Sequence, residues 1–235
     1  ELIIASRTPK NESKIKRTPL TIIQAKQELL LQEPESKIID KSEDINIMLK
    51  ETKRLTKLIK ELMVLAMADS NELKMHKEKI NIDDLIKEII TPYKDFAEMQ
   101  EKEIILDLNY GKEANIDRNK INQLLVIILD NAIKYTAEKD TITVKTYSKE
   151  GKCVIEVADT GIGISKEAAK HVFDRFYRED KARSREKGGT GLGLSIAHTI
   201  VKLHGGNIKI TSNEPKGAKV IIKINFAEDL TDNHY

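Results

Sequence analysis

The spacing of apolar residues between positions 45 and 66 limits the fold of this chain more than any other feature. Seven residues there are separated alternately by three and four positions, and Thr52 is the one polar member: Ile45, Met48, Thr52, Leu55, Ile59, Leu62 and Ala66. This is the seam of a helix that packs along a second helix. The same spacing occurs more weakly upstream, at Leu20, Ile23, Gln27 and Leu30. Because Pro34 disfavours helix in the residue before it, we predict a helical hairpin broken at residues 32–36.

The predicted hairpin carries more apolar surface than two helices can hide from water. The surplus consists of the run Leu29, Leu30 and Leu31 and of a second stripe with Leu58 and Leu65. A four-helix bundle formed by two copies of the chain is the simplest way to bury it. We therefore predict a homodimer through the hairpin.

The periodicity becomes mixed beyond residues 69–73, so we predict two domains, 1–70 and 71–235. In the second, Asn81 and Asp84 resemble the capping pair of a helix that runs to about Gln100. Further helices are expected at 118–135 and 191–204, the latter closed by Gly205 and Gly206, with strands at 103–108, 141–147, 152–158, 208–212 and 219–226. The predicted fold class is α+β: a helical hairpin followed by an α/β sandwich of one mixed sheet against about three helices.

Composition excludes several classes of function. The 40 Lys and Arg residues nearly cancel the 38 Asp and Glu residues, so no overall field draws the chain to nucleic acid or to a membrane, and a phosphate must be held locally. The longest apolar run, 124–129, is too short to cross a bilayer. Cys153 has no cysteine partner and is expected to be a half-buried strand residue. The chain begins with Glu1, so we expect a soluble piece of a longer protein.

Two segments of the second domain carry residues suited to a nucleotide. Asn131, Lys134 and Tyr135 share one helical face, where an amide oxygen beside an ammonium suits Mg²⁺ and phosphate, unless this face merely meets water. In DTGIGI (159–164), the glycines let the backbone approach a flat ligand, and the carboxylate of Asp159 can accept from an amine. An ordinary glycine turn after a strand is the alternative for this second segment.

Two further segments follow in the chain. In VFDRFYR (172–178), Phe173 and Phe176 are expected to anchor a loop in the core, and Arg178 could reach an anion. GGTGLGLS (188–195) opens a helix with glycines that bare amide N–H groups, which form an anion site. This glycine string does not follow a strand of a βαβ unit, so a Rossmann site is not indicated, and a Walker motif is absent.

In this order and spacing, the four segments resemble the N, G1, F and G2 boxes of the GHKL (Bergerat-type) ATP-binding domain. Sensor histidine kinases, DNA gyrase, Hsp90 and MutL share that domain. The hairpin ahead of it, with RTPLT (17–21) near its start and LIKELMVLAMADS (58–70) at its end, is similar to the dimerisation hairpin of histidine kinases of two-component systems. The resemblance extends over about residues 10–224.

The resemblance implies a role for each matching residue, with ATP and Mg²⁺ as ligands. It implies that Asn131 binds Mg²⁺, that Lys134 and Arg178 meet phosphates, and that Tyr135 lies over the nucleotide. Asp159 would bind the adenine amine beside a wall shaped by Gly161 and Gly163. The phosphates would lie under a mobile lid, residues 179–187, in a cradle made by Gly189, Gly191, Leu192 and Gly193. A response regulator would dock near Thr18. The resemblance also implies a cytoplasmic fragment of a membrane-bound sensor.

The sequence departs from the family pattern where the phosphate should be accepted. Alignment on RTPL puts Lys14 in place of the acceptor histidine and Ile15 in place of the following acid. An ammonium has no free lone pair near neutral pH, whereas neutral imidazole has one. Ile127 replaces an asparagine or glutamate, and Ala218 replaces a frequent threonine near the adenine. The other histidines, at 76, 171, 198, 204 and 234, are expected to be surface or packing residues.

Two functions therefore remain open. The first is the core of a sensor histidine kinase that transfers the γ-phosphoryl group of ATP to a histidine on another chain or protein. The alternative is a pseudokinase that acts as an ATP-binding dimeric scaffold or sensor, which the residues at positions 14, 15 and 127 favour.

Overall fold

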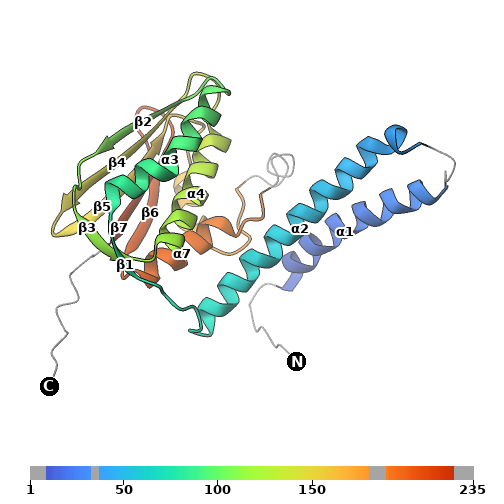
Figure 1. Ribbon diagram of the computed structural model, residues 1–235, viewed down its shortest axis with the longest axis horizontal. Coiled ribbons are helices and arrows are strands. Elements are labelled where there is room, and N and C mark those ends of the chain that lie inside the picture. Colours follow the sequence, from blue (N-terminus) through green and yellow to red (C-terminus); the bar gives the residue numbers. More distant parts are fainter. Residues whose placement is uncertain (1–8, 33–36, 180–188, 225–235) are drawn as a thin grey trace.

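The computed structural model consists of a long helical hairpin that projects from an α/β unit (Figure 1). It describes residues 9–32, 37–179 and 189–224, and it describes side chains from Pro19 onward. The hairpin is formed by α1 (Pro9–Gln32), the short 3₁₀ helix η1 (Ile38–Lys41) and α2 (Ser42–Asp69). An ion pair of 2.6 Å between Lys26 Nζ and Asp44 Oδ1 joins its two arms. The predicted hairpin is confirmed.

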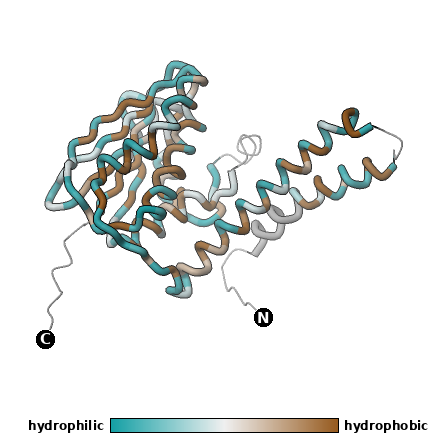
Figure 2. Tube along the Cα trace, viewed as in Figure 1, coloured by the Kyte–Doolittle hydropathy of each residue, from teal (hydrophilic) through white to brown (hydrophobic). Residues whose placement is uncertain are grey.

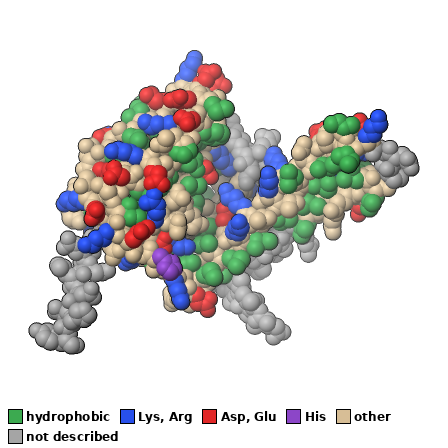
Figure 3. Space-filling model, viewed as in Figure 1, with side chains coloured by type: hydrophobic (Ala, Val, Ile, Leu, Met, Phe, Trp, Pro, Cys, Tyr) green, Lys and Arg blue, Asp and Glu red, His purple; other side chains and the backbone are tan. Residues whose placement is uncertain are grey.

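Four of the seven seam residues of α2 are exposed in the single chain, and the other three are partly buried. Thr52, its polar member, donates its hydroxyl to the Met48 carbonyl oxygen, 2.8 Å away, so the hydroxyl is satisfied within the helix. Ile59 is 56% exposed, and Figures 2 and 3 show the apolar residues along the hairpin. Exposed large apolar residues of the hairpin, including η1, are Leu20, Leu29, Leu31, Ile38, Ile39, Ile45, Leu49, Ile59, Met63 and Met67. The predicted dimer would cover such a face, and it stays a prediction.

Leu58 and Leu65 do not belong to this surplus. They are only 3% and 2% exposed, and they join the hydrophobic core of the α/β unit. The expectation that these leucines require a second copy of the chain is therefore wrong. A stripe on a helix shows which residues share a face, but a neighbouring domain can cover that face as well as another helix can.

A five-stranded mixed sheet organises the α/β unit, in the order β2-β4-β5-β7-β6. Strand β2 (Glu103–Leu108) runs parallel to β4 (Thr141–Lys149), and the pairings of β5 (Lys152–Asp159), β7 (Ala218–Ile224) and β6 (Asn207–Ser212) are antiparallel. Helices α3 (Ile82–Glu98), α4 (Arg118–Tyr135) and α7 (Gly193–Leu203) cover one face of the sheet (Figure 1). This arrangement confirms the predicted sandwich of one mixed sheet against three helices.

Local signals placed the ends of the predicted helices and strands of the α/β unit within about two residues. The Asn81 side chain accepts hydrogen bonds from the amides of Asp83 and Asp84 and so caps α3, as the sequence predicts. Helix α4 has the predicted bounds, whereas α7 begins at Gly193 rather than residue 191. A small antiparallel sheet of β1 (Glu78–Asn81) and β3 (Glu113–Ile116), and the short helix α5 (Lys166–His171), were not predicted.

Cys153 lies deeper than the sequence indicated. It is fully buried on β5, where burial raises the pKa of its thiol to about 12. The protonated thiol is therefore a small apolar core residue. In the part of the chain that the structure describes, no helix combines the length and apolar character of a membrane span.

His204 links the C-terminal end of α7 to the start of α4. Its Nδ1 lies 2.8 Å from the Ile200 carbonyl oxygen, and its Nε2 lies 3.3 Å from the amide nitrogen of Asp117. A neutral ring that donates from Nδ1 and accepts at Nε2 satisfies both contacts. Burial lowers the pKa of His204 below its ordinary value, and the hydrogen bond to Ile200 opposes this shift. His204 is thus a core residue, in line with its predicted packing role.

This junction predicts that the protein loses stability in mild acid. Because the pKa of His204 is lower in the folded state, the unfolded state binds the proton first as pH falls below about 6.5. We expect the free energy of unfolding to fall by about 1 kcal/mol more in the wild type than in His204→Gln between pH 7.5 and 5.5, since protonation removes one buried acceptor. Urea unfolding at both values measures this difference. An equal loss in both proteins would contradict the assignment.

Candidate functional site

The C-terminal end of α4 forms one wall of the candidate site. Lys102 Nζ donates to the Ile133 carbonyl oxygen at 2.8 Å, and Thr136 Oγ1 donates to the Ala132 carbonyl oxygen at the same distance. The Lys102 bond satisfies the Ile133 carbonyl in the last turn, whereas the Ala132 carbonyl also accepts from the Thr136 amide at 3.1 Å. The Lys102 ammonium suits the negative end of the helix dipole. The last turns of α4, which carry Asn131, Lys134 and Tyr135, are therefore held in place.

Charged groups gather around Tyr135. Lys134 Nζ lies 5.3 Å from the centre of the Tyr135 ring, which is 38% exposed. Burial raises the pKa of the Tyr135 hydroxyl, while the charge of Arg178 opposes the rise and that of Glu179 adds to it. The aromatic ring, Lys134 and Arg178 thus lie near one another, an arrangement suited to an aromatic ligand that carries negative charge.

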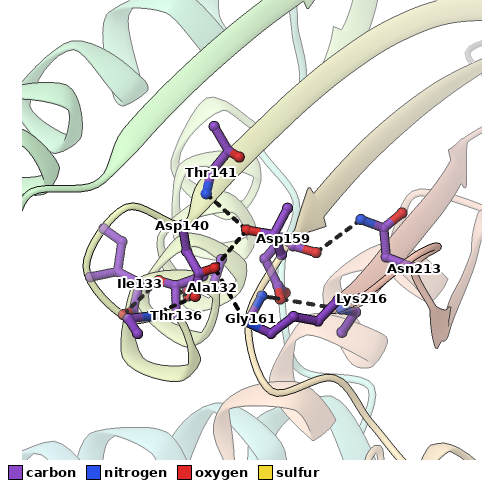
Figure 4. Close-up of polar contacts among 12 residues, drawn as sticks. Ala132, Ile133, Thr136, Asp140, Thr141, Asp159, Gly161, Asn213 and Lys216 are labelled. Carbon is purple, nitrogen blue, oxygen red and sulfur yellow. Dashed lines mark hydrogen bonds and ion pairs between the residues drawn. The ribbon is translucent and has the colours of Figure 1, made fainter.

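Asp159 lies at the end of β5 and is 8% exposed. Its Oδ1 accepts from the amide of Gly161 at 2.9 Å and from the amide of Ala218 at 3.2 Å, and its own carbonyl oxygen accepts from Asn213 Nδ2 at 2.9 Å (Figure 4). Burial raises the pKa of the carboxyl, and the two amides oppose this shift. Both amide contacts fall on Oδ1, so Oδ2 can serve as the acceptor for a ligand amine.

A network of hydrogen bonds around Thr160 and Asp140 supports the turn after Asp159. Thr160 Oγ1 donates to Asp140 Oδ1 and accepts from the Thr141 amide, each at 2.9 Å, and Lys216 Nζ lies 3.4 Å from the same Asp140 oxygen (Figure 4). These residues come from three separate stretches of the chain. Sequence reasoning missed them, together with Asn213, because only the pairing of β4, β5 and β7 brings them together.

The predicted glycine wall lies directly against the end of α4. A Cβ atom on Gly161 would stand 2.2 Å from the Tyr135 carbonyl oxygen, which also accepts from the Ile162 amide at 3.1 Å. Gly163 has a φ of +78°, and a Cβ there would lie 3.1 Å from the Gly217 carbonyl oxygen. Backbone approaches of this kind require glycine at position 161.

The glycine-rich segment runs along α4 on the same side. A Cβ atom on Gly189 would lie 2.9 Å from Lys134 Nζ, and one on Gly193 would lie 3.3 Å from Cγ2 of Ile127, which is half-buried. Gly191 has a φ of +78°, and its carbonyl oxygen accepts from the Phe176 amide at 2.9 Å. The predicted phosphate cradle therefore approaches the Asn131 and Lys134 end of α4.

Several predicted residues have other surroundings. The Leu192 side chain is fully buried, so only its backbone could face a ligand. Phe173 and Phe176 pack against the core, as predicted. The side chains of Lys14, Ile15 and Thr18, lid residues 180–187 and His234 lie outside the described parts of the structure.

The remaining histidines lie away from this site or in packing positions. The exposed His171 ring contacts Asp174, with 3.0 Å between Nδ1 and Oδ2, and the His198 ring lies 5.7 Å from that of Phe173. The His76 amide donates to Asp117. Among the described residues, no group of three His, Cys, Asp or Glu side chains is arranged to bind a metal ion.

Asn131 nonetheless fits the Mg²⁺ site that the resemblance implies. Its amide is partly accessible and shares a helical face with Lys134. Mg²⁺ keeps several water ligands and commonly takes one or two protein oxygens together with substrate phosphates. One amide oxygen beside a phosphate cradle is sufficient for such a donor set.

Comparison with known proteins assigns this architecture to a family. Residues 116–228 match the model of the histidine kinase-, DNA gyrase B- and HSP90-like ATPases. The matched stretch contains α4, both glycine segments and the sheet strands β4 to β7. This stretch of the chain therefore belongs to that ATPase family.

Within the family, the chain is a homologue of histidine kinases. It is 39% identical over 201 residues to the signal transduction histidine-protein kinase ArlS of Staphylococcus aureus (strain USA300). The aligned region covers 86% of this chain but only 44% of ArlS. The chain thus spans less than half the length of this relative.

Solved structures show the same fold. The histidine kinase AdeS of Acinetobacter baumannii matches with a TM-score of 0.71 at 24% identity, over 90% of this chain and 97% of AdeS. The histidine kinase ThkA, in its complex with the response regulator TrrA, matches with a TM-score of 0.71 at 24% identity, over 91% of this chain and 59% of that chain.

Proposed function

We propose that the chain is the cytoplasmic core of a sensor histidine kinase that binds Mg-ATP and transfers its γ-phosphoryl group to a histidine. The observation that carries the proposal is the convergence of two segments, 159–164 and 189–195, on the end of α4. Gly161 lies against the Tyr135 carbonyl, and Gly189 lies against Lys134. The Asp159 carboxylate, two residues before Gly161, accepts hydrogen bonds from two backbone amides. An acidic acceptor, an aromatic ring, cations and bared amides together suit the parts of one ATP molecule.

Each part of the site has a proposed role. Asp159 accepts the adenine amine, with Gly161 and Gly163 forming the wall beside the base. Tyr135 covers the nucleotide, Lys134 and Arg178 pair with phosphate oxygens, and Asn131 supplies an oxygen to Mg²⁺. The backbone at positions 189, 191, 192 and 193 receives phosphate. When bound, the metal ion supplies neutralisation of phosphate charge, and positioning by these residues does most of the remaining work.

The proposed phosphate acceptor is on another chain or protein. Lys14 occupies the position of the acceptor histidine in the resemblance, and an ammonium is not a nucleophile near neutral pH. We propose a homodimer through the exposed seam of α2, a division at residue 70, and a response regulator that docks near Thr18. The complex of the fold neighbour ThkA with a response regulator supports such a partner. We also propose that a sensor region outside this chain anchors the whole protein in a membrane.

The pseudokinase alternative has one specific observation in its favour. Ile127 packs against the core and lies beside Gly193, the last residue of the proposed phosphate cradle. An isoleucine there cannot accept a proton or orient a water molecule, as a polar side chain could. On this alternative, the site binds ATP but transfers nothing.

Restoring the acceptor separates the two functions. We expect the double variant Lys14→His/Ile15→Glu to acquire acid-labile label from γ-labelled Mg-ATP, and the wild type to label only a histidine-bearing partner fragment. The reason is that the residues proposed to hold Mg-ATP are present, whereas the acceptor histidine is absent. Asp159→Asn added to the double variant is the control, which should abolish the label.

Two other labelling results would lead to different conclusions. Nucleotide binding without label on either the double variant or the partner would support the pseudokinase. Acid-labile label on the wild-type chain alone would contradict the argument from Lys14.

A further inference from the structure

Glu61 of α2 reaches from the hairpin to the glycine-rich segment of the ATP-binding domain. It is 9% exposed, and its Oε2 accepts a hydrogen bond of 2.6 Å from Thr190 Oγ1. Thr190 lies between Gly189 and Gly191, and it is buried as well. The same Thr190 oxygen accepts from the Leu192 amide at 3.3 Å. A carboxylate of the hairpin is thus connected, through one hydroxyl, to a backbone amide of the proposed phosphate cradle.

This contact belongs to a built interface between α2 and the ATP-binding domain. Leu58 and Leu65, three residues before and four residues after Glu61, lie on the same helical face and are buried in the shared core. Further along α2, Asp69 binds Arg175 through two hydrogen bonds of 2.7 and 2.9 Å. Figure 1 shows α2 passing beside α7. Glu61 is therefore held against Thr190 by apolar packing on both sides.

The start of α7 is a place where negative charge is stabilised. The N-cap residue of α7, Leu192, provides no side-chain hydrogen bond to the helix. The dipole of an 11-residue helix favours an anion near its first turn. Burial raises the pKa of Glu61, whereas the hydrogen bond from Thr190 and the charge of Lys57 oppose this shift. Through the Thr190 hydroxyl, the Glu61 carboxylate thus interacts with the start of α7. The nucleotide phosphates are proposed to bind at the same helix start.

We propose that Glu61 competes with the phosphates of the nucleotide, so that docking of α2 on the ATP-binding domain and phosphate binding weaken each other. The inference rests on the proposed function of the site. Two anionic groups beside one helix start repel each other, and the Leu192 amide cannot donate fully both to Thr190 and to a phosphate. Because coupling between two binding events is reciprocal, a bound nucleotide weakens the docking of α2 by the same factor.

Calorimetry on the whole chain tests the competition with two ligands. The first is the non-hydrolysable triphosphate AMPPNP with Mg²⁺, and the second is adenosine, which has no phosphates. We expect Glu61→Gln to bind AMPPNP about 10-fold more tightly than the wild type, within the usual range of allosteric coupling, and to bind adenosine with unchanged affinity. A purely structural role would instead weaken both ligands or neither.

Two further variants control the result. Glu43→Gln removes an exposed carboxylate from the first turn of the same helix and should change neither affinity. Asp69→Asn loosens the docking without touching Thr190, and we expect it to tighten AMPPNP binding about twofold, the effect of one exposed ion pair.

Two results would overturn the inference while the proposed function stands. They are equal AMPPNP affinities of Glu61→Gln and the wild type, and parallel shifts for AMPPNP and adenosine. If neither ligand binds the wild type, the proposed function itself fails, and the inference falls with it.

Discussion

Replacing Asp159 with asparagine is expected to weaken AMPPNP binding by about 100-fold. The amides of Gly161 and Ala218 both donate to Oδ1, so the asparagine must keep its carbonyl oxygen at that position. Its NH₂ group then replaces Oδ2 and, in the proposed complex, faces the adenine amine, donor against donor. A buried mismatch of this kind costs about 2–3 kcal/mol, which corresponds to the expected loss of affinity.

Calorimetry with Mg-AMPPNP measures this loss, and the chain offers a matched control. Asp107 lies on the edge strand β2, where its carboxylate forms an ion pair of 3.0 Å with Lys145 outside the candidate site. Asp107→Asn makes the same chemical change and should leave the affinity unaltered. Binding by Asp159→Asn within twofold of the wild type would exclude Asp159 as the adenine acceptor.

Replacing Gly217 with alanine is expected to lower the free energy of unfolding by about 3 kcal/mol or more. Gly217 has a φ of +109°, and an added Cβ would lie 1.8 Å from the carbonyl oxygen of Asp159 and 2.6 Å from its carbonyl carbon. Both are backbone atoms in a paired strand, so the loop must move away. That movement removes the hydrogen bond from the Ala218 amide to Asp159, in addition to the strain itself.

Gly111→Ala is the control that separates the cost of the steric clash from the cost of a positive φ. Gly111 also has a positive φ, +64°, but an added Cβ would find no atom within 4 Å. We expect a cost of about 1 kcal/mol there, the ordinary penalty for a left-handed alanine. Urea unfolding compares the two variants, and equal losses would show that the contact with Asp159 is not close.

Elements with a local cause were predictable from the sequence. The cap at Asn81 involves amides only two and three residues away, and helix α4 has its own cap at Asp117 and an unbroken apolar pattern. The two missed strands, β1 and β3, have four residues each. Such short segments show no clear alternation, and they pair across more than thirty residues of chain, as the register of Glu78 with Ile116 shows.

The residues of the candidate site likewise fall into a predictable group and an unpredictable group. Its glycines, Asn131, Lys134, Tyr135 and Asp159 lie in short motifs whose order could be recognised. Partners such as Ala218, Asn213 and Lys102 could not be found, because each comes from another part of the chain. The Ala218 backbone amide supports Asp159 although its side chain lacks the expected hydroxyl, and Glu61 reaches Thr190 across 129 positions.

The sequence by itself determined the long helices, the cap at Asn81 and the residues of the four short motifs, since these depend on neighbours along the chain. The tertiary structure decided what covers each face. Periodicity places Leu58, Glu61 and Leu65 on one stripe of α2, but only the folded chain shows that the ATP-binding domain packs against that stripe. The physical reason is that burial requires a complementary surface, and a helix pattern does not specify which surface supplies it.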